Sequence, residues 1–409
     1  MTAIDKYLQG YAEVELNYLA DFPKDKLYKH CLIIPAFDES PSFIERLHNK
    51  FTAINDHDVL NIIVINQPDN LQQCQQNNVL FEYLQQHSQL LWYKNNLFLM
   101  RSNKIDFLII DRFRQNKIPI KQGVGLARKI GTDIAACLIH RKQCLSPWIH
   151  STDADAYLPK NYFIVGDEFK TGYSAFLYQF QHAITDTTKD PITQRATQLY
   201  ETGLHYYVSG LKWAESPYAF HTIGSLLAIH YDYYCQGRGF PKKAGGEDFY
   251  LLNKLSKLAE IGHVDAMITL ESRRSLRVPF GTGPAVDKII EQQQMQKFDY
   301  HPNVFITLKA FLFTTEQAIL NDSDLSLLKN KFDKPTQAAL EALLIDKLIA
   351  HLGTLTNKQK MNHFHHWFDA FRTLKFIHFL QENYYPKMLL EAALELSPFD
   401  QTGATKVEA

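Results

Sequence analysis

The chain has 409 residues, of which 45% are hydrophobic and 21% are charged, and its formal net charge is -1. This composition is typical of a globular protein with a sizeable core, large enough for a major and a minor domain. The near-neutral charge argues against any general attraction to nucleic acid or to anionic lipid.

The amino terminus lacks a basic segment followed by an apolar one, and no apolar run is long enough to cross a bilayer. Five cysteines are scattered along the chain without a Cys-x-x-Cys pair. These features predict reduced thiols and a cytoplasmic protein. Peripheral contact with a membrane surface stays open.

Residues 1–28 are expected to form a helical lead-in. Short β-branched runs then alternate with helical spacing, an alternation that predicts a parallel α/β sheet with helices on both faces. Expected strands cover residues 31–34, 61–66 and 105–110, and a fourth short strand includes Trp148 and Ile149 and runs into the loop with Asp153 and Asp155. Expected helices cover 43–51, 71–91 and 130–138. Ligands of such sheets bind beyond the carboxyl ends of the strands.

Three polar clusters follow these strands: Asp38 and Glu39, then Asn66 to Asp69, then Asp153 and Asp155. The aspartates of the third cluster are separated by one residue. Carboxylates are hard oxygen ligands that suit Mg²⁺ or Mn²⁺, and Mg²⁺ is usually held by one or two of them together with substrate phosphates. Asp-x-Asp alone is common, so two solvated acids in a loop are the competing interpretation.

Gly123 and Gly125 open a helix in which Arg128 and Lys129 lie in the first turns. The helix dipole disfavours cations at that end, so these two side chains either are solvated or face an anion such as a bound diphosphate. No third glycine completes a dinucleotide-binding fingerprint.

Glu247 and Asp248 follow a glycine-rich loop and begin another helix. Capping of that helix would explain acids at this position. Arg273, Arg274 and Arg277 precede the turn at Gly281 and Thr282. They could hold a phosphate or carboxylate, or form a solvated basic loop. His221 and His263 are further metal-ligand candidates, although each is more often structural.

From about residue 301 the spacing becomes helical, which predicts a separate C-terminal helical region over 301–409. The run His363-x-His365-His366 lies within it and is interpreted as a polar helix face rather than a metal site. We therefore expect three parts: the lead-in (1–28), an α/β domain (29–300) and this helical region. Its helices are candidates for contacts between copies of the chain.

Taken together, four segments resemble motifs of the family 2 glycosyltransferases, which have the GT-A fold. These segments are Ile33-Ile34-Pro35-Ala36-Phe37-Asp38-Glu39, Ala127-Arg128-Lys129-x-Gly131, Asp153-Ala154-Asp155, and Gly239-Phe240-Pro241 through Gly246-Glu247-Asp248. The resemblance covers roughly residues 30–285. It implies a GT-A fold, a Rossmann-like and mostly parallel central sheet flanked by helices, here with the C-terminal helical appendage.

The chain departs from the family pattern in three ways. The second strand ends Asn66-Gln67-Pro68-Asp69 instead of in the usual Gly-Ser-x-Asp turn, Lys129 replaces an asparagine, and the Gln-x-x-Arg-Trp box of processive synthases is absent. The resemblance therefore indicates a non-processive enzyme and leaves the nucleotide base undefined.

The resemblance implies a metal-dependent hexosyltransferase that moves a sugar from a nucleotide-sugar donor to an acceptor hydroxyl, with inversion. In this interpretation Asp248 is the general base beside Glu247, and a metal (Mg²⁺ or Mn²⁺) is held by Asp153, Asp155 and His263. The donor is contacted by Pro35, Ala36, Asp38, Glu39, Asn66, Arg128 and Asp153. A phosphate or the acceptor is contacted by Arg273, Arg274, Arg277, Gly281 and Thr282.

Two other functions stay open at this point. One is a sugar-phosphate nucleotidyltransferase, although no glycine-rich segment with arginine or lysine lies near the first strand to hold a triphosphate. The other is a non-catalytic nucleotide-binding or scaffold protein of the same fold.

Overall fold

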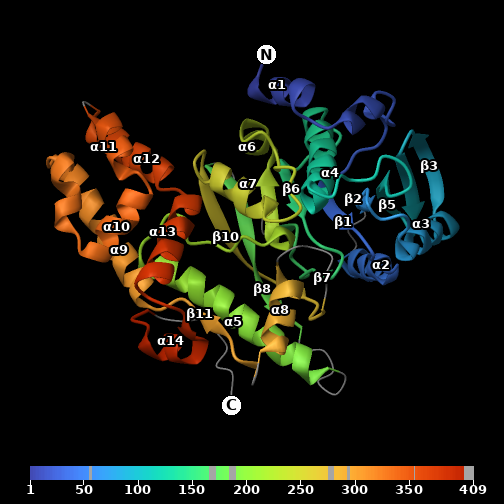
Figure 1. Cartoon of the computed structure of the whole chain (residues 1–409). Helices are drawn as coiled ribbons and strands as arrows, with labels where there is room; N and C mark the ends of the chain where they lie inside the picture. Colours follow the sequence, from blue (N-terminus) through green and yellow to red (C-terminus); the bar gives the residue numbers. More distant parts are fainter. Residues whose placement is uncertain are drawn as a thin grey trace. The chain divides into compact units, whose positions relative to one another are not determined.

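The structure is a computed structural model that describes residues 1–54, 58–164, 172–183, 190–274, 281–292, 295–353 and 355–399 (Figure 1). The chain divides into two compact units. The first comprises Met1–Asp186 and Thr222–Pro284, and the second comprises Thr187–His221 and Ala285–Ala409. Residues 187–221, which were expected in the α/β domain, thus belong with the C-terminal helices.

The first unit is built on a sheet whose strand order is β3-β4-β5-β2-β1-β6-β9-β8-β10-β7. In the described part of the chain, seven of these strands run in one direction and β4, β7 and β9 run the other way. This mostly parallel sheet with flanking helices confirms the expected fold class. The strands are β1 (His30–Ala36), β2 (Val59–Asn66), β3 (Gln89–Lys94), β4 (Leu97–Ser102), β5 (Ile105–Arg112), β6 (Trp148–Ser151), β7 (Ala156–Tyr157), β8 (Tyr173–His182), β9 (Leu227–His230) and β10 (Glu260–Leu270).

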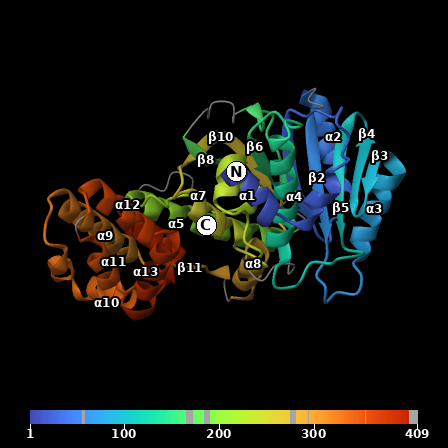
Figure 2. The same ribbon diagram turned by 90° about the horizontal axis from the view of Figure 1, so that it is seen from above.

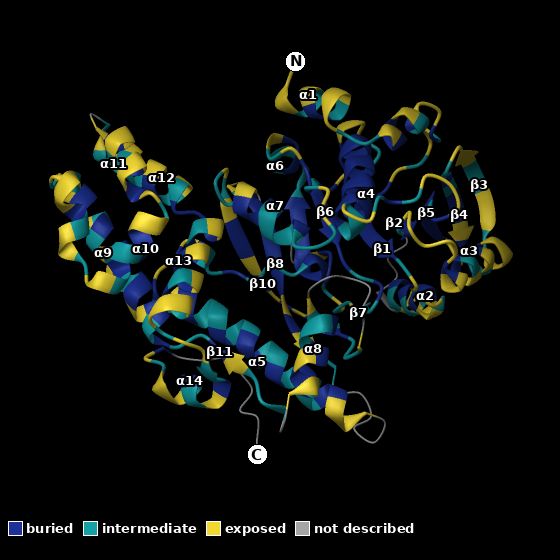
Figure 3. Cartoon of the chain, viewed as in Figure 1, coloured by how far each residue is buried: buried dark blue, intermediate teal, exposed yellow. Residues whose placement is uncertain are grey.

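The centre of this sheet is apolar on both faces. Every residue of β1, β2 and β6 is buried, as expected for parallel strands covered by helices (Figure 3). Helix α4 (Gly123–His140) packs against β1, β2 and β6 (Figure 2). Gly131 permits this approach, because a Cβ there would lie 2.6 Å from the Ile33 Cγ2 atom. Close packing of α4 fixes the position of the residues near its start.

The remaining helices of this unit are α1 (Ala3–Gly10), the 3-10 helix η1 (Val14–Leu19), α2 (Ser42–Ile54), α3 (Gln75–His87), the 3-10 helix η3 (Gly224–Leu226), α6 (Tyr231–Gln236) and α7 (Glu247–Leu255). The predicted helix over 71–91 was too long. It ends at His87, and the following residues form the antiparallel hairpin of β3 and β4, which extends the sheet beyond β5. Each of these two strands has only six residues, too few for their alternation to stand out beside the helix.

The second unit is helical. It contains α5 (Pro191–Trp213), α9 (Asn303–Leu320), the 3-10 helix η5 (Leu325–Lys331), α10 (Lys334–Ala342), α11 (Ile345–Leu352), α12 (Asn357–Trp367), α13 (Ala370–Asn383) and α14 (Leu390–Leu396), with a small sheet of β11 (Phe298–Asp299) and β12 (Met388–Leu389). Helix α8 (Thr282–Glu291) spans the boundary between the units. An aromatic cluster around Phe305, Phe311 and Phe376 forms the core of the second unit.

No helix among the described residues has the length and hydropathy of a membrane-spanning segment. All five cysteines are buried free thiols.

A buried polar cluster attaches the N-terminal segment to α4. The Asp133 carboxylate accepts hydrogen bonds from Tyr7 Oη (2.5 Å), Tyr234 Oη (2.7 Å) and Lys129 Nζ (2.8 Å). It also accepts one from the Glu13 backbone N–H (2.8 Å). Neither interpretation of Lys129 as a solvated or ligand-facing cation was right, because this ammonium is buried against a carboxylate of the protein itself.

We predict that Asp133→Asn lowers the free energy of unfolding by about 3 kcal/mol, because it leaves the buried Lys129 ammonium without its main counter-charge. Urea titration measures the effect. Asp322→Asn is the matched control, since its ion pair with Lys360 is on the surface and is expected to contribute less than about 1 kcal/mol. Equal losses in the two variants would contradict this role of Asp133.

Candidate functional site

The predicted polar clusters gather at the carboxyl-end rim of the sheet. Asn66 is the last residue of β2, and its side-chain amide donates a hydrogen bond to the Ala36 carbonyl at the end of β1 (3.1 Å). Asp38 follows β1 with φ of 58°, in the left-handed region, and its backbone N–H donates to Asn77 Oδ1 (3.0 Å). Strand β6 is parallel to β1, so Asp153 and Asp155 follow it at the same rim. Pro35 and Ala36 lie within β1 itself.

Arg128 of α4 connects the acids of two distant segments. Its guanidinium, which is buried, donates to Asp153 Oδ1 (2.5 Å) and to Glu247 Oε1 (2.8 Å). A further N–H donates to Ser151 Oγ (2.9 Å), at the end of β6. The first aspartate of the Asp-x-Asp motif and the start of α7 are thereby held by one side chain.

This arrangement corrects the interpretation of Arg128. The sequence indicated either a solvated cation or one facing a diphosphate, whereas the side chain pairs with two carboxylates of the protein. Both glycines at the start of α4 also serve packing: a Cβ at Gly123 would lie 2.7 Å from Ala244 Cα, and one at Gly125 would lie 2.5 Å from the Pro241 carbonyl oxygen. The small residues admit the loop that precedes Glu247.

Gly224, which the sequence analysis did not single out, makes room for the guanidinium. A Cβ at this position would lie 2.5 Å from one terminal nitrogen of Arg128. The Gly224 carbonyl also accepts a hydrogen bond from Ser151 Oγ (3.3 Å). In the sequence, the only indication of this close approach to Arg128 is a glycine within an apolar stretch. Arg128 itself lies almost a hundred residues earlier.

Glu247 and Asp248 occupy the first turn of α7, after Gly246, whose φ of 70° places it in the left-handed region. Glu247 is buried against Arg128. The Asp248 carboxylate accepts a hydrogen bond from the Phe249 N–H (2.7 Å) and is partly exposed. Burial, followed by the negative charge of Glu247, raises the pKa of Asp248 to about 7. A helix start favours the ionised carboxylate and would lower this pKa, but desolvation outweighs that effect here.

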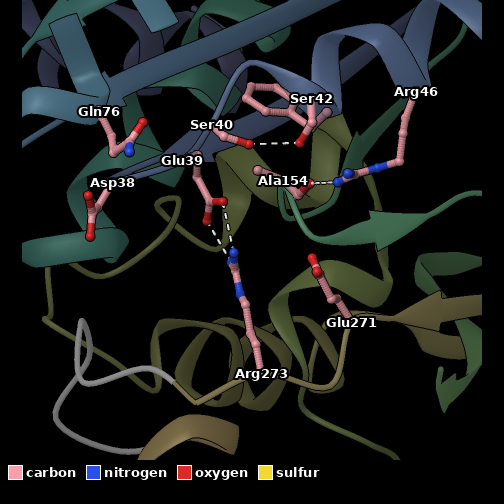
Figure 4. A pocket seen from close by; sticks show the side chains of 10 residues that line it. Asp38, Glu39, Ser40, Ser42, Arg46, Gln76, Ala154, Glu271 and Arg273 are labelled. Atoms are coloured by element: carbon pink, nitrogen blue, oxygen red, sulfur yellow. Dashed lines mark hydrogen bonds and ion pairs between the residues drawn. The ribbon is translucent and has the colours of Figure 1, made fainter. Parts of the chain in front are cut away.

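Arg273 lies between two other acids of the rim. Its guanidinium donates to both oxygens of Glu39, at 2.6 and 2.9 Å (Figure 4). It also lies 2.8 Å from Asp155 Oδ2. Strand β10 ends at Leu270, so Arg273 approaches from the same rim. The Glu271 N–H donates to the Asp155 carbonyl (3.1 Å), which holds the two loops together.

A polar pocket of about 330 Å³ opens beside the contact of Arg273 with Glu39 (Figure 4). Its walls come from the loop after β1, the first turns of α2 and α3, and the segments that follow β6 and β10. The lining residues are Asp38, Glu39, Ser40, Ser42, Phe43, Arg46, Gln76, Ala154, Glu271 and Arg273. Of these, Ser40, Ser42, Phe43, Arg46, Gln76 and Glu271 were not predicted, since only the folded chain brings them to the pocket.

Not all predicted residues join this group. His263 is exposed on β10, seven residues before the strand ends, and so lies roughly 20 Å along the strand from the Asp155 loop. The prediction that it completes a metal site with the aspartates was therefore wrong. His221 belongs to the second unit, where its ring contacts that of His205.

Several predicted phosphate contacts lie at the edge of what the structure describes. Arg277 is outside the described residues, and Arg274 is exposed next to Arg273. Gly281 has φ of 119°, and Thr282 begins α8. Contacts of these residues with a phosphate or an acceptor stay predictions.

Asp155 could hold a divalent metal ion together with substrate phosphates, but not as part of a site made of protein ligands alone. Among the described residues, no group of three or more histidine, cysteine or acidic side chains is placed to hold a metal. Asp155 is partly exposed beside the pocket. One carboxylate with substrate phosphates is an ordinary Mg²⁺ coordination.

Comparison with known proteins gives fold-level likenesses only. No protein-family model matches the chain, and no curated protein matches it. Among solved structures, S. aureus TarS residues 1–349 in complex with UDP-GlcNAc has a TM-score of 0.39 and 10% identity over 87% of this chain and 91% of that one.

Two further structures are similar to a comparable degree. The mannosyltransferase PcManGT from Pyrobaculum calidifontis, in complex with GDP-Man and Mn²⁺, has a TM-score of 0.37 and 13% identity over 93% of this chain and 95% of that one. Glucosyl-3-phosphoglycerate synthase from Mycobacterium tuberculosis has a TM-score of 0.33 and 12% identity over 67% and 84%. Likeness this low does not by itself establish a function.

We predict that Gly224→Ala destabilises the first unit by about 2 kcal/mol, because the added methyl group displaces a buried and paired guanidinium. Thermal unfolding measures the loss. Gly10→Ala is the control, since a Cβ there would meet nothing within 4 Å. A Gly224→Ala variant as stable as Gly10→Ala would contradict the packing described for Arg128.

Proposed function

We propose that the chain is a glycosyltransferase of the GT-A type that moves a sugar from a nucleotide-sugar donor to an acceptor hydroxyl, with a divalent metal ion and with inversion. One observation carries this proposal. Arg128 joins Asp153 of the Asp-x-Asp segment to Glu247, the neighbour of Asp248, so that a donor-side acid and an acceptor-side acid belong to one rigid group. That juxtaposition is what transfer between two bound substrates requires.

The donor nucleotide would bind in the polar pocket beyond β1. Its size suits the nucleoside part of a donor, and its walls offer amide, hydroxyl and carboxylate groups for hydrogen bonding. Glu39 and Asp38 lie at the end of β1, where parallel α/β sheets bind ligands. Asn66 would act indirectly, since its amide holds the Ala36 carbonyl and thereby the backbone that leads to Asp38.

The metal ion, Mg²⁺ or Mn²⁺, would be held by Asp155 together with the two phosphates of the donor. When bound, such an ion supplies charge neutralisation for the leaving nucleoside diphosphate. Asp153 is already fixed by Arg128, so we assign it to orienting the donor and shaping the loop rather than to strong coordination.

Asp248 would take the proton of the acceptor hydroxyl. A general base works best when its pKa is near the working pH, and burial together with Glu247 raises the pKa of Asp248 to about 7. Arg128 neutralises Glu247 and limits this rise. Attack by the acceptor oxygen on the anomeric carbon, opposite the leaving phosphate, would invert the configuration there.

Turnover of a panel of nucleotide sugars, with and without Mn²⁺, tests the proposal. We predict hydrolysis or transfer with at least one donor, and a loss of about 10²-fold or more in Asp248→Asn and in Asp155→Asn. Asp265→Asn, a surface position on β10, is the control for general effects of charge removal. Full activity of Asp248→Asn would remove it as the base.

Two further measurements distinguish the two other functions. Pyrophosphate released from a nucleoside triphosphate and a sugar phosphate would identify a nucleotidyltransferase instead. Absence of any metal-dependent nucleotide binding would favour a scaffold protein.

The pH dependence gives an independent prediction. The base acts in its ionised form, so kcat/KM should rise with pH, with a midpoint near the pKa of about 7. Glu247→Gln removes the charge that helps to raise this pKa, and should move the midpoint to lower pH. A profile that stays flat between about pH 5 and 8 would contradict the assignment of Asp248.

A further inference from the structure

The Arg273 guanidinium pairs with Asp155, the carboxylate that would hold the proposed metal ion. It spans the gap between Glu39 and Asp155, at 2.6 and 2.9 Å from the oxygens of the former and 2.8 Å from the latter. One planar cation thus pairs with two carboxylates that come from the ends of different strands. Figure 4 shows its contact with Glu39. Glu39 and Arg273 both line the polar pocket described above.

Charge balance explains why this contact forms. Glu39 and Asp155 are partly buried acids brought to within reach of one cation, and without a counter-charge they would repel each other. A guanidinium meets both because its fork donates several parallel hydrogen bonds. A divalent cation held by Asp155 would compete with the guanidinium for that carboxylate.

We propose that Arg273 is an internal substitute for the metal ion, which makes metal binding depend on the nucleotide. In the ligand-free protein its guanidinium neutralises Asp155 and Glu39, and a divalent cation alone gains little by displacing it. A nucleoside diphosphate changes the balance, because its phosphates offer the guanidinium a new partner and complete the coordination of the metal. Metal and nucleotide therefore bind together.

This proposal rests on the proposed function, and it makes a thermodynamic prediction of its own. Two ligands that share a linked group change each other's affinity by the same factor, typically about 5- to 150-fold. The wild-type protein should bind Mn²⁺ weakly alone and about tenfold or more tightly with a saturating nucleoside diphosphate. Arg273→Gln removes the competing guanidinium, so Mn²⁺ alone should bind about tenfold more tightly than to the wild type, and the effect of nucleotide should shrink.

Electron paramagnetic resonance of free Mn²⁺ measures these affinities without any turnover. The titration uses the full chain alone, with UDP and with GDP. Arg101→Gln is a matched control, since Arg101 also pairs with an aspartate, Asp106, but at the opposite rim of the sheet. It removes the same charge and should leave the Mn²⁺ affinity unchanged. Arg273→Lys keeps the charge without the fork and should give an intermediate affinity, which preserves the test if Arg273→Gln does not fold.

The outcomes separate the two proposals. Equal Mn²⁺ affinity in the wild type, Arg273→Gln and Arg273→Lys would overturn the role of Arg273 while leaving the metal site intact. A gain in affinity that also appears in Arg101→Gln would overturn it as well, because a general change of charge would then suffice. If neither the wild type nor any variant binds Mn²⁺ with either nucleotide, both this proposal and the metal-dependent function are overturned.

Discussion

The buried guanidinium of Arg128 is the contact on which the candidate site depends. It reaches from the first turns of α4 to Asp153, in the loop after β6, and to Glu247, at the start of α7. Glu247 is buried, so without Arg128 it would be an acid with a high cost of desolvation, whereas Asp153 is partly exposed. A buried arginine without partners would cost still more. Removing one member typically costs about 3–5 kcal/mol, so the three segments keep a fixed relation to one another.

The surrounding glycines follow from this constraint. Gly224 leaves space for the guanidinium, and Gly123 and Gly125 let the loop before Glu247 approach the start of α4. The backbone of this loop packs against the start of α4, where a helix that begins with glycines can otherwise bind an anion. The site is thereby built from three loops whose spacing is set by short contacts, while Arg273 joins the next pair of acids along the rim.

Much of this could be predicted from the sequence, and the remainder has physical reasons. The strands β1, β2, β5 and β6 are apolar runs bounded by turns, and parallel strands bring their carboxyl ends to one rim, so the positions of Asp38, Asn66 and Asp153 followed. The partners of Arg128 and Lys129 could not be predicted. A local sequence pattern shows that a cation at a helix start needs an anionic partner, but it does not show which residue supplies that partner. His263 was misplaced because the sequence does not show how far it lies from the end of its strand, and β10 continues for seven residues beyond it. The pKa of Asp248 depends on desolvation, which only the folded chain reveals.

Calorimetric titration of the protein with nucleoside diphosphates in the presence and absence of Mn²⁺ tests the central claim most directly. The account predicts binding of at least one of UDP and GDP that requires the metal in the wild type and is lost in Asp155→Asn. Binding that needs no metal and survives Asp155→Asn, or no binding at all, would contradict it.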